Sequence, residues 1–231
     1  MIKDVTAIVA AAGQGLRMES VTRKQYLFLE KVPVLARSLN LFLQNSRIGE
    51  VIAVIPSGER SDVQNLLQPY CPIERIRLVD GGATRQESVG RGLDELPEQA
   101  ALVCIHDAAR PLASSGLLDA LLGAAEEWGA AVPVLPPADT IKEVDRSGLI
   151  VSTPDREFLR LVQTPQVFKK DIITSAYSRA GEKGLQATDD ASLVEAMGRP
   201  VKTVPGEAEN LKITSPRDLD LASLIIKETG V

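Results

Sequence analysis

Small and basic residues near the N-terminus have the pattern of a phosphate-binding loop. An apolar run at 5–9 is followed by Gly13 and Gly15, then by Arg17 and, further along, by Lys24. Glycines after a strand allow backbone N–H groups to approach an anion closely, and basic side chains add positive charge. The segment therefore predicts a phosphate site with Arg17 and Lys24 as its cations. The alternative is that both side chains are ordinary solvated surface charges.

Two familiar phosphate motifs do not fit this loop. A Walker loop needs Gly-Lys-Ser or Gly-Lys-Thr, which the segment lacks. A dinucleotide-binding fingerprint needs a third glycine where Met18 stands, and an acidic residue at the end of the next strand, near Ile55, where none occurs. The sequence thus disfavours a nicotinamide-dependent oxidoreductase, which is kept only as an alternative.

A glycine pair follows a second apolar run, at 76–79. Gly81 and Gly82 come first, Ala83 follows them, and Ser88 falls on the first turn of a predicted helix. One interpretation is a tight strand-to-helix connection in which glycine only supplies a positive φ. The functional interpretation is that Gly82 and Ala83 lie against the flat base of a nucleotide, with Ser88 beside them.

Charged residues follow a third run, at 102–105. His106 is the only histidine, and a lone histidine at a strand end is more typical of a hydrogen-bonded core residue than of a catalyst. Asp107 can lie near a nucleotide and its Mg²⁺, and Arg110 can bind an anionic substrate. Because there is one histidine, Ser-His-Asp hydrolases and multi-histidine metal sites are disfavoured.

The elements that must position these loops alternate along the chain. Short apolar runs predict strands buried on both faces, and stretches with helical spacing predict helices between them. This alternation predicts an α/β fold with a mostly parallel twisted sheet flanked by helices, in which ligands bind beyond the carboxyl ends of the strands. The predicted strands lie at 5–9, 51–55, 76–79, 102–105 and 130–134, and the predicted helices at 33–43 and 117–128.

One segment, at 137–154, departs from the alternation. Residues 139–144 and 149–153 favour extended structure on either side of a turn at 145–148, with too few apolar positions for a core of their own. We expect a β-hairpin that packs on this domain or on another subunit. Because no repeat, low-complexity stretch or linker interrupts the sequence, we expect one domain over residues 1–231.

The composition limits the class of protein. The chain has 231 residues, of which 44% are hydrophobic and 25% charged, as is typical of a globular protein. Its net charge of −5 gives no basic footprint for nucleic acid or for an anionic membrane surface. No apolar run reaches the roughly 20 residues of a membrane span, and no signal peptide is recognisable. Two isolated cysteines, Cys71 and Cys104, fit a reducing compartment, so we expect a cytoplasmic protein.

Taken together, the segments resemble the cytidylyltransferases that act on sugar-alcohol phosphates. The closest resemblance is to the 2-C-methyl-D-erythritol 4-phosphate cytidylyltransferase family of the non-mevalonate isoprenoid pathway. One departure is Ala10, where many members have proline, and it affects backbone stiffness rather than chemistry. The matching segments occur in family order at 11–13, 17–18, 24–26, 80–82, 106–111, 139–142, 164–166, 188–191 and 210–214.

The resemblance implies a nucleotidyltransferase (Rossmann-like) fold, CTP as the nucleotide and Mg²⁺ held mainly by the CTP phosphates, with no metal ligands from the protein. It also implies a homodimer in which the hairpin at 137–154 is an arm that helps to form the partner's substrate site. Implied catalytic residues are Arg17, Lys24, Arg156 and Lys212, the last two holding the acceptor phosphate in line. Residues implied to bind CTP are Ala11, Ala12, Gly13, Gly15, Gly81, Gly82, Ala83, Ser88, Asp107 and Ala108. Those implied to bind the sugar-alcohol phosphate are Asp107, Arg110, Thr140, Arg156, Thr164, Thr188 and Lys212.

The implied reaction suits a chain with a single histidine. The attacking phosphate is already an anion near neutral pH, since its second pKa is about 6, so no general base is needed. What the reaction needs is cancellation of the charge that grows on the α-phosphate and on the leaving pyrophosphate, which Arg17 and Lys24 can provide.

Several alternatives stay open at this point. The acceptor can instead be ribitol 5-phosphate, or the chain can be a nucleotide sensor without turnover. Arg156 can be a surface charge at a helix start, Lys212 the outward residue of a strand, and Thr188 only the N-cap of a helix at 189–197.

Overall fold

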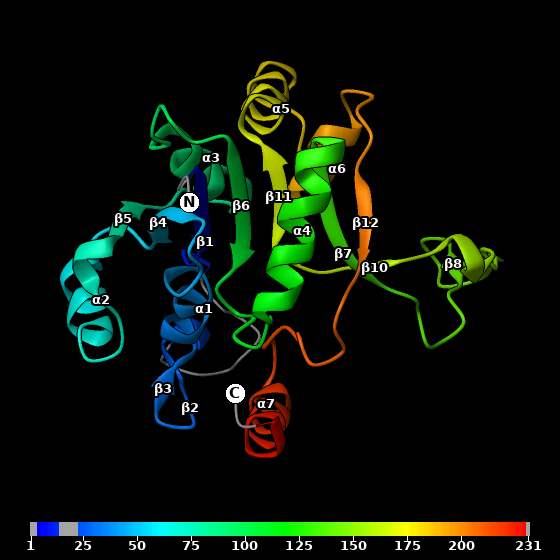
Figure 1. Cartoon of the computed structure of the whole chain (residues 1–231). Coiled ribbons are helices and arrows are strands. Elements are labelled where there is room, and N and C mark those ends of the chain that lie inside the picture. Colours follow the sequence, from blue (N-terminus) through cyan, green and yellow to red (C-terminus); the bar gives the residue numbers. More distant parts are fainter. Residues whose placement is uncertain (1–3, 14–22, 230–231) are drawn as a thin grey trace.

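The computed structural model describes residues 4–13 and 23–229, and within them the chain forms an eight-stranded sheet with helices on both faces (Figure 1). The strands follow the order β10-β7-β11-β6-β1-β4-β5, and β12 pairs with β7. Their bounds are Val5–Ala10 (β1), Ile48–Ile55 (β4), Ile76–Asp80 (β5), Leu102–Asp107 (β6), Ala130–Leu135 (β7), Leu161–Val162 (β10), Gln166–Lys169 (β11) and Lys202–Pro205 (β12).

The parallel part of the sheet brings the predicted ligand-binding loops together. Strand β1 is parallel to both of its neighbours, and its last residue, Ala10, pairs with Val54 of β4 and Asp107 of β6. Strand β5 extends the same arrangement, with Asp80 opposite Ile55. The carboxyl ends of these four strands therefore reach one edge of the sheet, where the loops after them meet.

Alternate residues of the central strands face two separate layers of helices. In β1, Ala7 and Val9 belong to one buried cluster and Ile8 to the other. This burial on both faces explains why the strands are nearly continuous apolar runs in the sequence. The first cluster includes residues of α1 (Val34–Leu43), α2 (Arg60–Leu67) and α4 (Ser115–Trp128), and the second includes residues of α3 (Arg85–Asp94), α5 (Lys170–Lys183) and α6 (Asp190–Glu195).

The five predicted strands and both predicted helices are present, with bounds that differ by a few residues. The sheet is nevertheless not parallel throughout, because β11 runs antiparallel to β6 and β7, and β10 runs antiparallel to β7. Strands β11 and β12 have four residues each, too short a run to show a period, which is why the sequence pattern did not predict them. The prediction of a mixed α/β fold with a mostly parallel sheet and flanking helices is confirmed.

The C-terminal helix α7 (Pro216–Thr229) packs on a small hairpin of β2 (Phe28–Leu29) and β3 (Val32–Pro33) through a third buried cluster. Its N-terminus is fixed by Asp218, whose Oδ2 accepts hydrogen bonds of 2.7 Å from the backbone N–H groups of both Thr214 and Ser215. A helix that begins after Ser215 therefore holds the preceding loop against the edge of the sheet. Short 3-10 helices lie at Lys24–Tyr26 (η2), Ile73–Arg75 (η3) and Arg156–Phe158 (η4).

The predicted hairpin is present, with β8 (Glu143–Val144) antiparallel to β9 (Ile150–Ser152). Asp145 closes its turn, since its Oδ1 accepts from the backbone N–H groups of Ser147 at 2.8 Å and Leu149 at 3.0 Å. Figure 1 shows the hairpin at the side of the molecule, away from the two helix layers. Its apolar side chains are exposed, by 54% at Val144, 68% at Leu149 and 63% at both Ile150 and Val151.

Both cysteines are buried free thiols, and burial raises the pKa of Cys71 to about 11. Among the described residues, the helices are too short or too polar to span a bilayer. The single-domain organisation and the cytoplasmic location stay predictions.

Candidate active site

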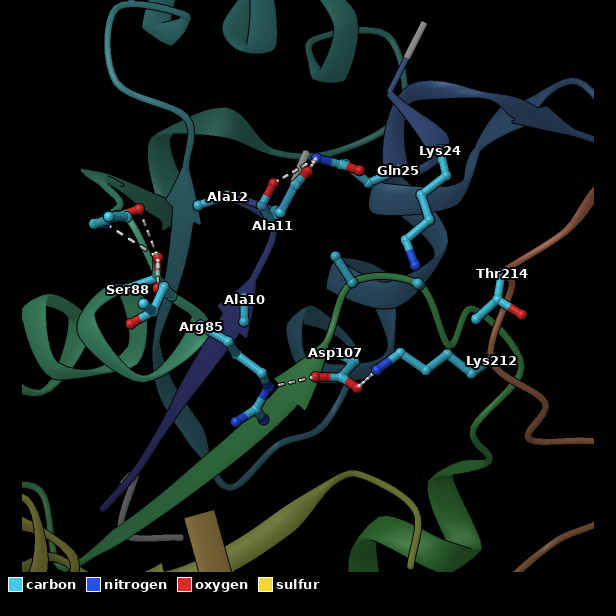
Figure 2. Close-up of a pocket in the computed structure, with 16 residues that line it drawn as sticks. Ala10, Ala11, Ala12, Lys24, Gln25, Arg85, Ser88, Asp107, Lys212 and Thr214 are labelled. Atoms are coloured by element: carbon cyan, nitrogen blue, oxygen red, sulfur yellow. Dashed lines mark hydrogen bonds and ion pairs between the residues drawn. The ribbon is translucent and has the colours of Figure 1, made fainter. Parts of the chain in front are cut away.

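A pocket of about 420 Å³ opens at the carboxyl ends of β1, β5 and β6 (Figure 2). Segments far apart in the sequence form its wall, because the parallel register brings the ends of these strands together. The residues that line it are Ala10, Ala11, Ala12, Gly13, Lys24, Gln25, Gly82, Ala83, Thr84, Arg85, Ser88, Asp107, Ala108, Ala109, Lys212 and Thr214.

The loop after β1 is held in place by hydrogen bonds from Gln25. The Gln25 side chain is 2% exposed, and its Nε2 donates to the carbonyl oxygens of Ala11 at 2.6 Å and Gly13 at 3.0 Å. Ala11, Ala12 and Gly13, which were predicted to bind the nucleotide, line the pocket. Two further predicted residues, Gly15 and Arg17, lie outside the described part of the chain.

The loop after β5 forms a second wall, next to the loop after β1. Ser88 ties it to α3, because its Oγ accepts from the Gly82 N–H at 3.1 Å and donates to the Thr84 carbonyl at 2.8 Å. Of the residues predicted to bind the nucleotide here, Gly82, Ala83 and Ser88 line the pocket and Gly81 does not. A Cβ on Gly81 would lie 2.3 Å from the Cβ of Ala12, so this glycine allows the two walls to touch. Gly81 thus serves close backbone packing, and its role as a nucleotide contact stays a prediction.

A chain of charged side chains crosses the floor of the pocket. Asp107 accepts from Arg85 Nε at Oδ1 (3.0 Å) and from Lys212 Nζ at Oδ2 (2.6 Å), as Figure 2 shows. Arg85 also donates to both carboxylate oxygens of Asp190, at 3.1 and 2.7 Å. Tyr177 completes the chain by donating its hydroxyl to Asp190 at 2.5 Å. Of these five residues, the sequence predicted only Asp107 and Lys212.

The charges on this floor stabilise one another's ionised forms. Burial on its own would raise the pKa of Asp107, but the cations of Arg85 and Lys212 outweigh it and hold that pKa well below its usual range. Burial would lower the pKa of Arg85, and the carboxylates of Asp190 and Asp107 raise it instead. Asp107 is therefore a carboxylate at every pH at which the protein is expected to act.

His106 lies directly behind the floor and is fully buried. Its Nε2 is 3.0 Å from the Arg110 carbonyl oxygen and its Nδ1 is 3.0 Å from Thr164 Oγ1. Burial lowers the pKa of His106 to about 4, so the ring is neutral near pH 7. The prediction of a hydrogen-bonded core histidine is confirmed.

Two predicted substrate residues support the floor instead of lining the pocket. Thr164 Oγ1 accepts from the backbone N–H of Asp107 at 3.0 Å. Arg110 Nη1 donates to the Asn210 carbonyl at 2.7 Å, and Asn210 Nδ2 donates to the Thr164 carbonyl at 2.9 Å. The fully buried Asn210, which was not among the predicted site residues, thereby fixes the loop that carries Lys212.

Lys24 and Lys212 enter the pocket from the same side (Figure 2). Lys24 Nζ donates to the Ile213 carbonyl at 3.1 Å, next to Lys212 in the chain. Residues 210–214 form a loop and not a strand, so the alternative for Lys212, an outward strand residue, is wrong. Ala108, predicted to bind the nucleotide, also lines the pocket.

The remaining predicted residues do not reach the pocket of their own chain. Thr140, Arg156 and Thr188 are exposed and are absent from the pocket lining. Arg156 begins the short helix η4, whose N-cap is Asp155. The alternative for Thr188 is wrong, because the N-cap of α6 is Asp189, which accepts from the Ser192 N–H.

The residues that were missed had weak signals. Gln25 and Arg85 stand inside segments already singled out, but polar residues in the first turn of a helix resemble surface positions. Asp190 and Asn210 also stand inside matching segments, at 188–191 and 210–214, whereas Tyr177 does not. All three belong to the floor only through contacts between distant parts of the chain, which no local spacing encodes.

Comparison with known proteins agrees with this architecture. The family model for 2-C-methyl-D-erythritol 4-phosphate cytidylyltransferase matches residues 5–228. A protein of that name from Pelotomaculum thermopropionicum is 45% identical over 96% of this chain and 94% of its own length. Another, from Desulforamulus reducens, is 42% identical over 97% of this chain and 96% of its own length.

Solved structures agree as well. The crystal structure of 4-diphosphocytidyl-2C-methyl-D-erythritol synthase from Anaerococcus prevotii matches with a TM-score of 0.85 and 32% identity over 97% of this chain and 99% of that one. That of 2-C-methyl-D-erythritol 4-phosphate cytidylyltransferase from Thermus thermophilus gives a TM-score of 0.79 and 37% identity over 96% and 98%. This chain belongs to the 2-C-methyl-D-erythritol 4-phosphate cytidylyltransferase family.

Proposed function

We propose that the chain transfers CMP from CTP to 2-C-methyl-D-erythritol 4-phosphate, giving 4-diphosphocytidyl-2-C-methyl-D-erythritol and pyrophosphate for isoprenoid synthesis. The observation that carries this proposal is one pocket in which two small-residue loops meet Lys24, Lys212 and Asp107, in a chain of this family. The relatives are named for the methylerythritol acceptor, so ribitol 5-phosphate is not favoured.

The bond changes need no proton transfer by the protein. An oxygen of the acceptor phosphate attacks the α-phosphorus of CTP, a new P–O bond forms, and the bond to the β-phosphate oxygen breaks. Pyrophosphate leaves with the electron pair of that bond. Since the acceptor phosphate is largely ionised near pH 7, a base such as His106 is not required, and this buried neutral ring does not face the pocket.

The two walls suit the nucleotide. Gly82 and Ala83 present a flat surface without long side chains, and Ser88 is held by its own hydrogen bonds beside them. The backbone of Ala12 and Gly13 lies across the pocket, where its polar groups can approach phosphate oxygens closely. We place the cytosine and ribose against the loop after β5 and the triphosphate along the loop after β1.

Cations then stabilise the transition state. Negative charge grows on the α-phosphate oxygens and on pyrophosphate, and a preorganised cation beside them lowers the barrier. Lys24 lines the pocket, and we assign it this role together with Arg17. Lys212 and Asp107 are paired with each other, and we assign them to the acceptor together with Arg110 and Thr164, which support the floor.

We propose a Mg²⁺ site formed mainly by the phosphates of CTP. Within the described part of the chain, Asp107 is the one acidic side chain that lines the pocket, and Arg85 and Lys212 occupy both of its oxygens. Among residues 4–13 and 23–229 there is no cluster of three or more His, Cys, Asp or Glu side chains able to hold a metal. This donor set fits an ion bound by phosphates and water, which supplies positive charge to the triphosphate oxygens.

We further propose a homodimer in which the hairpin at 137–154 reaches the partner's acceptor site. Its apolar side chains are exposed in the single chain, as are Phe158 (81%) and Leu161 (50%) just after it. Thr140, Arg156 and Thr188 lie outside the pocket of their own chain, and a second copy is the partner that could place them near acceptor phosphate.

The test is pyrophosphate release with CTP and Mg²⁺, run in parallel with methylerythritol 4-phosphate and ribitol 5-phosphate. Turnover with the first acceptor alone is the expected result. Turnover with ribitol 5-phosphate alone would keep the nucleotide site and overturn the acceptor. Binding of CTP without turnover on either acceptor would instead indicate a nucleotide sensor.

A further inference from the structure

Arg85 occupies an unusual position between the nucleotide wall and the floor of the pocket. It is the first residue of α3, the helix that also carries Ser88. Its side chain does not point along that wall but crosses to the end of β6, where Nε donates to Asp107 Oδ1 (Figure 2). One residue thus joins the helix of the nucleotide site to the carboxylate of the acceptor site.

The far end of the guanidinium is anchored by a buried carboxylate. Asp190, at the start of α6, has a side chain that is 1% exposed and accepts from both Nη1 and Nη2 of Arg85. The Tyr177 hydroxyl, from α5, donates to the same carboxylate. A bidentate pair of this kind fixes the plane of the guanidinium as well as its position.

Arg85 is therefore engaged differently from Lys212. All three nitrogens of the Arg85 guanidinium donate to carboxylates, two to Asp190 and one to Asp107. Lys212 donates to a single carboxylate oxygen of Asp107. A guanidinium already balanced by two carboxylates suits an orienting role better than direct binding of phosphate.

Asp107 is the residue that this arrangement orients. Arg85 fixes its Oδ1, which leaves Oδ2 directed at Lys212. We propose that Arg85 is a positioning residue for the reaction: held by Asp190 and Tyr177, it sets the carboxylate of Asp107 and, through it, the ammonium of Lys212 for the acceptor phosphate. The inference rests on the proposed function and deepens it.

A purely structural role for Arg85 makes a different prediction. If Arg85 only held α3 in place, its loss would disturb Ser88 and Gly82 and would weaken CTP binding first. If it acts through Asp107, its loss weakens the use of the acceptor and leaves CTP binding nearly intact. The split between the two substrates therefore separates the roles.

The experiment is a double-mutant cycle of Arg85→Gln and Asp107→Asn, with Arg179→Gln, an exposed arginine on α5, as the matched control. Steady-state kinetics give kcat and the acceptor KM, and calorimetry gives the CTP dissociation constant. For Arg85→Gln we expect acceptor kcat/KM to fall about 30-fold or more and CTP affinity to change less than about 3-fold. In the Asp107→Asn background the same change should cost less than about 3-fold. Independent, additive effects would overturn the proposal, as would an equal loss for both substrates.

Conservative changes keep the test decisive if Arg85→Gln folds poorly. Arg85→Lys retains the charge but not the planar fork, so it should recover part of the acceptor kcat/KM. Tyr177→Phe removes only the hydrogen bond from the tyrosine hydroxyl to Asp190. It should give a smaller effect of the same kind, with a larger change in acceptor KM than in the CTP dissociation constant. If neither variant separates the two substrates, the inference fails. A wild-type chain without turnover on any acceptor would instead mean that the proposed function fails.

Discussion

The floor of the pocket and the hairpin at 137–154 differ in how their side chains are satisfied. On the floor, Asp107 and Asp190 are each bonded to two partners within the chain. In the hairpin, Ile150 is 63% exposed and the main polar contacts join neighbouring residues of the hairpin itself. The floor is therefore bonded within one chain, whereas the hairpin, for which we propose contact with a second copy, leaves its apolar side chains exposed.

The largest effect should come from Lys24, which lines the pocket. For Lys24→Ala we expect kcat to fall about 10²–10³-fold, because a preorganised cation facing the growing charge is lost. CTP affinity should change far less, since the walls that hold the nucleotide stay in place. Pyrophosphate release gives kcat, and calorimetry gives the CTP affinity.

Lys183→Ala, an exposed lysine near the end of α5, is the matched control. It removes the same charge far from the pocket lining and should leave both values unchanged. Equal losses of rate and of CTP binding in Lys24→Ala would make Lys24 a ground-state contact and would contradict its catalytic role.

The next largest effect should be a fall in the free energy of unfolding at acidic pH, caused by His106 behind the floor of the pocket. The pKa of His106 is lowered by burial to about 4 in the folded chain, against about 6.5 when unfolded. Between these values the unfolded state binds a proton that the folded state does not, so the free energy of unfolding falls as the pH falls. The loss from His106 reaches about 3 kcal/mol at pH 4, and Asp107 adds its own loss only below its unfolded pKa of about 3.9.

Urea unfolding at several pH values from 7 to 4 measures this dependence. His106→Gln removes the titrating ring, so its stability should vary less across that range, even if it is lower at pH 7. An equal slope for the wild-type chain and the variant would show that the buried ring is not the source.

Much of the floor's scaffold could be predicted from the sequence, because local patterns encode it. Strands buried on both faces are apolar runs, and parallel strands place the residues after Ala10, Asp80 and Asp107 at one edge. The sequence therefore predicted two walls and a charged floor without any knowledge of which residues touch.

The partners on the floor could not be predicted in the same way. Arg85 meets Asp190 across 105 positions of the chain, and the order of helices and strands does not specify such a pair. The antiparallel insertion of β11 between β6 and β7 was missed for a similar reason, since four residues carry too little periodicity. The hairpin was predicted because Asp145 and Gly148 are local turn residues, whereas a single sequence does not specify what its exposed side chains contact.

A smaller effect, on the acceptor KM alone, should come from Arg156, which follows the hairpin at 137–154. For Arg156→Ala we expect the acceptor KM to rise about tenfold, the size of one exposed charge contact to phosphate, with CTP affinity unchanged. Mixing this variant with Lys24→Ala tests whether the arm acts across the dimer. If it does, a mixed dimer has one site with both Lys24 and Arg156 intact.

Random mixing of the two variants should then restore about a quarter of the wild-type activity at low acceptor concentration, because half of the dimers are mixed and each has one intact site. Rates that stay at the average of the two parent variants would place Arg156 in its own chain's site, or outside any site. Arg179→Ala in place of Arg156→Ala is the control for the mixing itself.

The smallest expected effect is the loss of stability from a substitution in the hairpin, compared with one in β1. Ile150→Thr should change the free energy of unfolding of the dilute chain by less than about 0.5 kcal/mol, because this side chain is already exposed. Ile8→Thr, at a fully buried position of β1, should cost about 2 kcal/mol or more through lost packing and a buried hydroxyl. Sedimentation should show weaker self-association for Ile150→Thr alone. A loss of stability as large as that of Ile8→Thr would mean that the hairpin belongs to the core of the single chain, and the contrast between the two regions would disappear.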